Sequence, residues 1–339
     1  MKARNVSGQT PGGKRVALAE VLPLDTPFLL LIFPIHACNF KCNYCLFSVE
    51  KANRGFVCDK TSLDINLYKK CIDDAALFPN KLKILRIAGM GEPLLHNNIV
   101  EMVEYAVLKN VANTVEIATN ASLLTPAMTD ALTEAGLSRL LLSIQGTTKK
   151  KYKDVSGVVI DFEKHVDNIR YFYNNKKKAH LYIKVVDTAL EDKEDEERFY
   201  KMFGDICDTI AVEHTVPIVP GVDYGKLSGV TDSSVTQFGL PVSVVRFCPK
   251  PFFQMQIMPD GKVAPCCAIP YPIIIDDCNT KSVREIWNGK QFKKFRRRML
   301  DGIENAGEFC ANCNIFKFRM SSEDILSNDA DRLKILYDI

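Results

Sequence analysis

The sequence lacks two features: an excess of charge of one sign, and a hydrophobic run long enough to cross a bilayer. Its 339 residues carry 44 Lys and Arg against 41 Asp and Glu, which leaves a net charge of +3. This balance gives no reason to expect a nucleic-acid partner. The apolar stretch 27–35 is too short for a transmembrane helix and precedes no small-residue cleavage site, so it predicts a buried strand. We therefore expect a cytoplasmic protein with no membrane partner.

Cysteine, in contrast, is abundant, with 12 residues in the chain. Disulfides are rare in the cytoplasm, so this number favours metal binding or redox chemistry. Four scattered residues, Cys58, Cys71, Cys207 and Cys278, are expected to be small buried side chains. The other eight fall into an early group and a late group.

The early group consists of Cys38, Cys42 and Cys45 in ACNFKCNYCLF, and no obvious fourth ligand accompanies them. Three thiolates on a 4Fe–4S cluster leave one iron free to bind another molecule, and an open metal position is suited to catalysis. Two alternatives stay open at this point. The cysteines could bind zinc with His36 as the fourth ligand, or they could be buried free thiols.

Short aliphatic runs alternate with stretches of helical periodicity along the first two thirds of the chain. The runs predict strands at 28–33, 84–88, 115–118, 140–144, 181–186 and 210–213. The stretches between them predict helices at 63–77, 98–109, 126–135, 162–173 and 194–203. Six such units predict an α/β fold, a partial (β/α)6 TIM-like barrel, with its chemistry at the C-terminal strand ends. We expect a flexible tail over 1–24, the barrel over 25–240 and a small C-terminal domain over 241–339.

Glycine and polar residues follow several of these strands. In GMGEPLLH, Gly89 and Gly91 permit close backbone approach, and the carboxylate of Glu92 suits an ammonium group. The next strands contribute Asn120 in TNASLLT, Ser143 and Gln145 in SIQG, and Lys184. Because parallel strand ends meet at one edge, these side chains are expected to surround one site together with the early cysteines.

The late cysteine group includes CPKPFFQMQIMPDGKVAPCC, in which alternating apolar residues surround Asp260-Gly261, a strong hairpin signal. A hairpin there would bring Cys248 and Cys266 together. The CANC segment adds Cys310 and Cys313. These four thiolates suffice for a closed cluster or a zinc site.

Taken together, CxxxCxxC, GMGEP, TNA and SIQG resemble the motifs of the radical S-adenosylmethionine (radical SAM) superfamily. The resemblance implies that the early cysteines hold a 4Fe–4S cluster whose open iron is chelated by SAM, which is reductively cleaved to a deoxyadenosyl radical. It further implies that the motif of Gly89 and Gly91 places Glu92 at the SAM amino group. By the same resemblance the ribose or carboxylate would meet Asn120, Ser143 and Lys184, and adenine would meet the backbone of Tyr44. Two residues depart from the common pattern, Ala121 for glycine and Gln145 for aspartate.

The order Cys248, GKVAPC, REIWNG and CxxC is similar to the SPASM or shorter twitch extension of radical SAM enzymes. This implies an auxiliary 4Fe–4S cluster on Cys248, Cys266, Cys310 and Cys313. One such cluster is expected, because no cysteine follows Cys313. The family spacing from Gly261 selects Cys266 as the ligand, which leaves Cys267 as a spare thiol beside the cluster.

The leading functional hypothesis is hydrogen abstraction from a small hydroxylated molecule, such as a sugar, nucleotide sugar or aminocyclitol, followed by oxidation or epimerisation. Glu213 or His214 is the candidate base for oxidation. Cys267 is the candidate hydrogen-atom donor for epimerisation. The alternatives are modification of a ribosomally made peptide, and a non-enzymatic zinc or cluster-binding protein. The enzyme would also need an external one-electron donor such as flavodoxin or ferredoxin.

Overall fold

A single curved sheet organises the chain in the computed structural model, which describes residues 1–6, 15–55, 57–227, 234–268 and 273–338. The strand order is β1-β7-β6-β5-β4-β3-β2-β8-β9-β10, and all neighbours from β1 to β8 are parallel. The strands are β1 (Arg4–Asn5), β2 (Leu29–Ile32), β3 (Leu82–Ile87), β4 (Ala112–Thr119), β5 (Arg139–Ile144), β6 (His180–Val186), β7 (Thr209–Glu213), β8 (Gln254–Ile257), β9 (Lys262–Ala264) and β10 (Asp276–Asp277).

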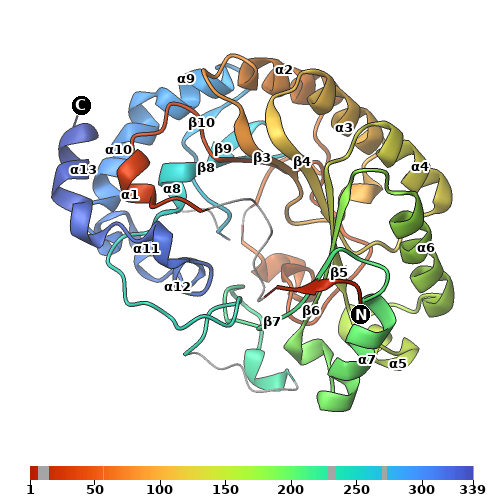
Figure 1. The fold of residues 1–339 in the computed structure, drawn as a ribbon. Coiled ribbons are helices and arrows are strands. Elements are labelled where there is room, and N and C mark those ends of the chain that lie inside the picture. The colour runs from red at the N-terminus through yellow and green to blue at the C-terminus, as the bar shows by residue number, and fades with distance from the viewer. Residues whose placement is uncertain (7–14, 56, 228–233, 269–272, 339) are drawn as a thin grey trace.

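The barrel helices cover the outer side of this sheet (Figure 1). They are α2 (Ile65–Ala75), α3 (Ile99–Leu108), α4 (Pro126–Glu134), α5 (Lys149–Ser156), α6 (Phe162–Asn175) and α7 (Lys193–Phe203). Local signals explain their starts: Thr125 accepts a hydrogen bond from the Met128 amide, and Pro126 occupies the first turn. The six predicted strands and five predicted helices are confirmed. The barrel prediction omitted α5, because its run of lysines carries little apolar periodicity.

The N-terminal segment corrects one expectation. A flexible tail was predicted over 1–24, but Arg4–Asn5 forms β1, which pairs with β7, and Leu18–Val21 forms helix α1. The Ala3 and Leu18 side chains are buried in the main core. The prediction is therefore wrong for these residues, because pairing with a distant strand orders them. Residues 7–14, most of the glycine-rich stretch, lie outside the described residues.

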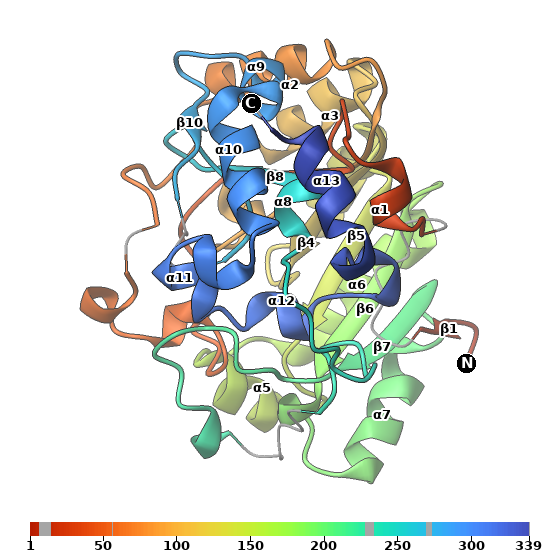
Figure 2. The same ribbon diagram turned by 90° about the vertical axis from the view of Figure 1, so that its left-hand side faces the viewer.

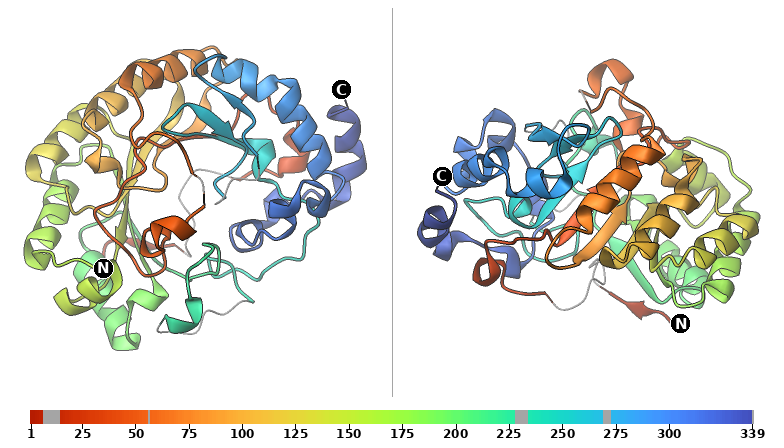
Figure 3. Two further views of the ribbon diagram at one scale, coloured as in Figure 1. Left: turned by 180° about the vertical axis from the view of Figure 1, so that it is seen from behind. Right: turned by 90° about the horizontal axis from the view of Figure 1, so that it is seen from above.

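The C-terminal third continues the barrel sheet. The Asp260-Gly261 hairpin is confirmed, but its first strand, β8, also pairs in parallel with β2, with Leu29 opposite Gln254. One hydrophobic cluster contains Leu30 of the barrel and Trp287 of the extension. The C-terminal helices are α8 (Lys250–Phe253), α9 (Val283–Asn288), α10 (Lys290–Met299), α11 (Glu308–Ala311), α12 (Ile315–Phe318) and α13 (Ala330–Leu336). Of these, α9 and α10 continue the ring of outer helices, whereas α8 and α12 lie inside it (Figures 1 and 3).

The extension thus stands at the open side of the curved sheet. Figure 2 shows α11, α12 and α13 in front of the barrel strands, on the side where the parallel sheet does not close on itself. Residues 248–319 can therefore reach the barrel interior. Within the described ranges, no helix is long and apolar enough to cross a membrane.

Candidate active site

The early cysteine loop follows β2 and packs on the GMGEP loop that follows β3. A Cβ atom at Gly91 would lie 2.2 Å from the Ile35 carbonyl oxygen and 2.8 Å from that of Ala37. The Glu92 amide donates to the Ala37 carbonyl over 2.8 Å. A Cβ atom at Gly89 would similarly overlap the Phe33 ring. The two glycines therefore permit the close approach that was predicted, and the approaching groups belong to the β2 strand end and cysteine loop.

The three early thiols lie within electrostatic reach of one another. Burial raises the pKa of Cys38 to about 11, and Glu92 and Cys45 raise it too, although the Phe40 amide and Asn120 oppose this. Burial likewise raises the pKa of Cys42, with added repulsion from Cys45 and Cys38. Thiolates that repel one another in a partly dry loop fit a cationic iron–sulfur core, because metal binding requires deprotonated cysteines.

Across the described segments, no three His, Cys, Asp or Glu side chains lie close enough together to hold a single metal ion. A 4Fe–4S cluster binds each thiolate at a different iron corner. The ligand roles of both cysteine groups stay predictions.

Glu92 joins the end of β3 to the end of β4. The side chain is 2% exposed. One carboxylate oxygen accepts from the Leu94 amide at 2.9 Å and the Thr119 hydroxyl at 2.5 Å, and the other accepts from the Asn120 amide at 2.7 Å. Both oxygens are thus occupied by the protein itself. A contact between Glu92 and the SAM amino group stays a prediction, and the structure adds a bracing role that the motif did not reveal.

Asn120 faces the cysteine loop. Its side-chain amide donates to the Asn39 side-chain oxygen at 2.9 Å and lies 3.9 Å from the Cys38 sulfur. The following residue, Ala121, has a φ of 59°. This left-handed conformation favours glycine, which gives a physical reason for glycine being common there.

Tyr44 is positioned by the residue that replaces the usual aspartate. The Tyr44 hydroxyl donates to the Gln145 side-chain oxygen, and the Gln145 amide donates to the Ser143 carbonyl at 3.0 Å. A neutral amide can accept and donate at once, as this arrangement requires. Sequence reasoning noted Gln145 only as a departure, because its partner is 101 positions away.

Two adjoining cavities lie inside the curved sheet, and the larger one extends from the starts of β2 and β3, at Leu29 and Lys83, to the loop after β3 at Gly89. The larger, of about 910 Å³, is lined by barrel residues including Gly89 and by Lys250, Cys267 and Arg319 of the extension. The smaller, of about 190 Å³, is lined by Tyr44, Cys45 and His214. Both linings include Ser143, Lys184, Glu213, Ile218, Val219, Gln237 and Arg319. The cavities therefore run from the early cysteine group to Cys267. Of the predicted SAM contacts, Gly91, Glu92 and Asn120 are missing from both linings, as far as the described residues define them.

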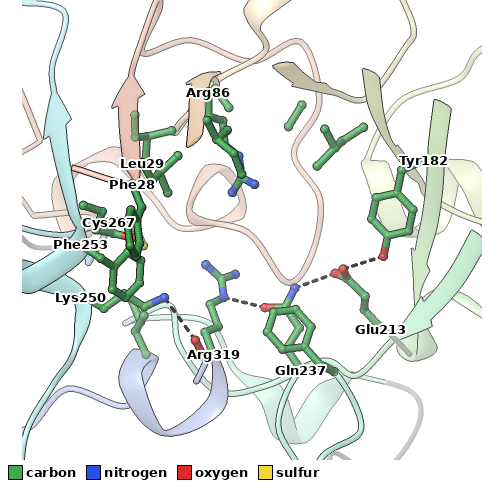
Figure 4. A pocket seen from close by; sticks show the side chains of 18 of the residues that line it. Phe28, Leu29, Arg86, Tyr182, Glu213, Gln237, Lys250, Phe253, Cys267 and Arg319 are labelled. Atoms are coloured by element: carbon green, nitrogen blue, oxygen red, sulfur yellow. Dashed lines mark hydrogen bonds between the residues drawn. The ribbon is translucent and has the colours of Figure 1, made fainter. Parts of the chain in front are cut away.

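Glu213 is the centre of a hydrogen-bond network in the shared wall (Figure 4). Its carboxylate accepts from the Lys184 ammonium at 2.6 Å, the Tyr182 hydroxyl at 3.1 Å and the Gln237 amide at 2.6 Å. Arg319 in turn donates to Gln237 at 2.6 Å. The sequence predicted Lys184 and Glu213 for separate roles, and the structure pairs them. The neighbouring candidate, His214, contacts Asp187 at 3.1 Å and lines the smaller cavity.

The late cysteines also form a group. Burial raises the pKa of Cys248, and so do Cys313 and Cys310, although the Lys250 amide and ammonium oppose this. Burial raises the pKa of Cys310 to about 12, with a contribution from Cys313. The Cys266 thiol interacts with Cys248 and Cys313. The late cysteines, Cys267 included, therefore interact with one another around the hairpin and the CxxC segment, and the four-ligand set stays a prediction.

Cys267 differs from its neighbour, because it lines the larger cavity (Figure 4). Burial raises the pKa of this thiol, but Lys250, Arg319 and other neighbours lower it more, so the net shift is downward. The Cys313 thiol interacts with Cys267 as well, so the choice of Cys266 as the ligand stays a prediction.

Comparison with known families assigns both halves of the chain. The radical SAM superfamily matches residues 32–202, about half of the chain, and the SPASM iron–sulfur cluster-binding domain matches residues 248–314. The "Tungsten-containing aldehyde ferredoxin oxidoreductase cofactor-modifying protein" of Pyrococcus furiosus is 32% identical over 107 residues, which are 32% of this chain and 28% of that protein. The chain thus matches only a minor part of that relative.

Two other relatives match over most of the chain. The "S-adenosyl-L-methionine-dependent 2-deoxy-scyllo-inosamine dehydrogenase" of Niallia circulans is 22% identical over 299 residues, covering 86% of this chain and 94% of that protein. The crystal structure of Streptococcus suis SuiB bound to precursor peptide SuiA superposes with a TM-score of 0.63 at 16% identity, covering 92% and 77% of the two chains. The second likeness shows a shared fold.

Proposed function

Because the chain belongs to the radical SAM superfamily and carries its SPASM domain, we propose that it abstracts hydrogen from a small hydroxylated molecule and oxidises or epimerises it. Its cofactors are 4Fe–4S clusters and SAM. In the proposal, Cys38, Cys42 and Cys45 hold the SAM-binding cluster, and the late cysteines hold the auxiliary one. When bound, the first cluster supplies the electron that cleaves SAM to methionine and a deoxyadenosyl radical.

The observation that carries the proposal is the continuous space between the two cysteine groups. One end is lined by Cys45 and Tyr44, and the other by Cys267. A substrate held there would be close to the radical source and to the auxiliary cluster. We infer that the smaller cavity receives part of SAM, where Ser143 and Lys184 supply polar groups.

Two outcomes of hydrogen abstraction are open to this site. Oxidation requires the substrate radical to lose a proton and an electron: Glu213 accepts the proton, and the late cysteines hold the electron acceptor. Glu213 would do so by exchanging one of its donors for the substrate hydroxyl. Epimerisation requires a hydrogen atom from the opposite face, and in the proposal the Cys267 thiol, which lines the cavity, gives it. The thiyl radical that remains returns to the thiol by taking up a proton and one electron from the external donor.

A sugar, nucleotide sugar or aminocyclitol is the substrate class we favour. The near full-length match to the Niallia circulans dehydrogenase supports it. Modification of a ribosomally made peptide is the second candidate, and the shared fold with the peptide-bound Streptococcus suis protein supports that alternative. In both cases we expect an external one-electron donor such as flavodoxin or ferredoxin, and a reducing cytoplasm that keeps the thiols free.

The test is an anaerobic incubation of the reconstituted enzyme with SAM, dithionite and either sugars and aminocyclitols or peptides. We expect deoxyadenosine formation to rise only with the hydroxylated small molecules. A rise with peptides alone would select the second candidate. Running the active reaction in deuterated water separates the outcomes, because epimerisation by an exchangeable thiol incorporates deuterium and oxidation does not.

A further inference from the structure

We infer that the larger cavity binds a phosphate group of the substrate through Arg86, Lys250 and Arg319. This inference rests on the proposed function, and it narrows the substrate class to phosphorylated small molecules such as sugar phosphates or nucleotide sugars. The chain as a whole carries almost balanced charge. A strong local excess of cations in its catalytic cavity therefore requires an explanation.

The cavity wall holds more cations than carboxylates. Its cationic residues are Arg4, Arg15, Lys83, Arg86, Lys184, Lys250 and Arg319. Among the described residues, its carboxylates are Glu213 and Asp324, and each already has a cation: Lys184 at 2.6 Å and Arg15 at 3.3 Å. The other cations have no carboxylate partner in the lining. Unpaired charge in a partly dry space is costly, and an anionic ligand removes that cost.

Arg86 projects from β3 into the barrel interior. It shares its carboxylate partner with a second arginine. Its Nε group pairs with Glu116, and the same carboxylate also binds Arg139. Glu116 is 0% exposed. One buried carboxylate thus faces two guanidinium groups, which leaves an excess positive charge. Within the described structure, no acceptor is recorded for the Nη groups of Arg86.

Arg319 and Lys250 come from the extension, on the other side of the cavity. Arg319 donates through Nε to the neutral Gln237 amide at 2.6 Å, and Lys250 donates to the Arg319 carbonyl at 3.2 Å. Neither cation has a carboxylate partner among the described residues. Figure 4 shows the Arg86 and Arg319 guanidinium groups and the Lys250 ammonium directed toward one open space.

The number and directions of these donors favour phosphate over carboxylate. A single guanidinium can satisfy both oxygens of a carboxylate, whereas a phosphate presents oxygens in several directions to several donors. Lys250 lies two residues from Cys248 and also balances the charge of the late thiolates. All three cations also act on the Cys267 thiol, but Arg86 does so more weakly than Lys250 and Arg319 and comes from a barrel strand, so it is the most informative residue to vary.

The test measures binding of inorganic phosphate and of acetate to the reconstituted protein by calorimetry, with saturating SAM and no reductant. We expect saturable phosphate binding that weakens with added salt, and acetate binding at least about tenfold weaker. Arg86→Gln and Arg319→Gln should each weaken phosphate binding about tenfold or more. Lys201→Gln is the control, because it removes one charge from the exposed outer face of α7 and should change nothing.

Equal binding of phosphate by the wild type and both variants, or acetate binding as tight as phosphate binding, would overturn the inference. If Arg86→Gln fails to fold, Arg319→Gln decides. Deoxyadenosine formation with dithionite and the hydroxylated small molecules, measured in the same preparations, separates a failure of the proposed function from a failure of the phosphate site. Its loss with phosphate binding intact would refute the proposed function, whereas the reverse result would refute the phosphate site alone.

Discussion

At the residue scale, Glu92 offers the sharpest test of what a motif residue does. Its carboxylate accepts hydrogen bonds from Leu94, Thr119 and Asn120. In Glu92→Gln the side-chain NH2 group is itself a donor and could not accept the hydrogen bonds that these residues donate. We therefore expect a loss of about 1–3 kcal/mol in the free energy of unfolding. SAM binding should weaken about tenfold or more, because the charge near the amino group is lost.

Chemical denaturation and SAM titration measure these two effects separately. Glu104→Gln on the exposed face of α3 is the matched control, with unchanged values expected. A variant that loses stability but keeps the wild-type dissociation constant for SAM would restrict Glu92 to bracing the strand ends.

Cys267 tests the fate of the substrate radical. Because it lines the cavity beside the predicted ligand Cys266, Cys267→Ala should leave iron content and SAM cleavage intact. If the enzyme epimerises, the variant should lose epimer formation and deuterium uptake from solvent. Mass spectrometry of the product measures both. Cys58→Ala is the control, because that thiol bonds to the Lys60 carbonyl at 3.0 Å in the loop after the early group. Normal turnover without deuterium in the product would remove the donor role and favour oxidation.

The motif residues could be located from the sequence, but their partners could not. Lys184 and Glu213 lie on the adjacent strands β6 and β7, and the sheet register sets their separation. The Tyr44–Gln145 contact similarly joins a loop to the end of β5. Contacts of this kind depend on tertiary packing, about which local periodicity carries no information.

At the scale of elements, the turn between β8 and β9 positions Cys266. Gly261 has a φ of 87°, and a Cβ atom there would lie 2.4 Å from the side-chain nitrogen (Nδ2) of Asn279. Gly261→Ala should therefore cost about 1–3 kcal/mol in unfolding free energy. It should also lower iron content at the auxiliary site. Thermal unfolding and iron analysis measure these effects, with Gly225→Ala, which has no strained φ, as the control. Unchanged stability would contradict the role assigned to this turn.

A buried histidine on helix α6 should make the stability of the protein depend on pH. Burial lowers the pKa of His165 to about 4, and its ring contacts the Tyr152 hydroxyl of α5 at 3.0 Å. The unfolded chain, with a pKa of about 6.5, binds the proton more readily, so stability is lost as pH falls from about 6.5 toward 4. This group should contribute a loss of about 1.3 kcal/mol between pH 7.5 and 5.5. Urea unfolding at both values measures it. His165→Gln should show a correspondingly smaller loss, and an identical loss would exclude this residue as the cause.

Elements with strong periodicity were predictable, whereas those stabilised by distant partners were not. The predicted strand at 84–88 and helix at 162–173 match β3 and α6 closely. Strand β1 has two residues and forms only because β7 offers a free edge. The hairpin at Asp260-Gly261 was visible as a turn signal, but the parallel pairing of β8 with β2 joins segments more than 200 positions apart.

At the scale of the whole molecule, one sheet and one core connect the barrel to the extension. The sheet runs without interruption from β1 to β10, and Trp287 donates from its indole nitrogen to the Leu24 carbonyl at 2.8 Å. This continuity fixes the late cysteine group relative to the early one, with the cavities between them. The central claim is that the two groups hold two 4Fe–4S clusters with different roles.

Iron, sulfide and deoxyadenosine analysis of the reconstituted Cys38→Ala, Cys42→Ala, Cys45→Ala triple variant tests this claim most directly. The wild type should carry about eight iron and eight sulfide per chain and cleave SAM. The triple variant should keep roughly half of the iron, because the auxiliary cluster is untouched, and should form no deoxyadenosine. Stoichiometric zinc in place of iron, or undiminished deoxyadenosine formation by the triple variant, would contradict the account.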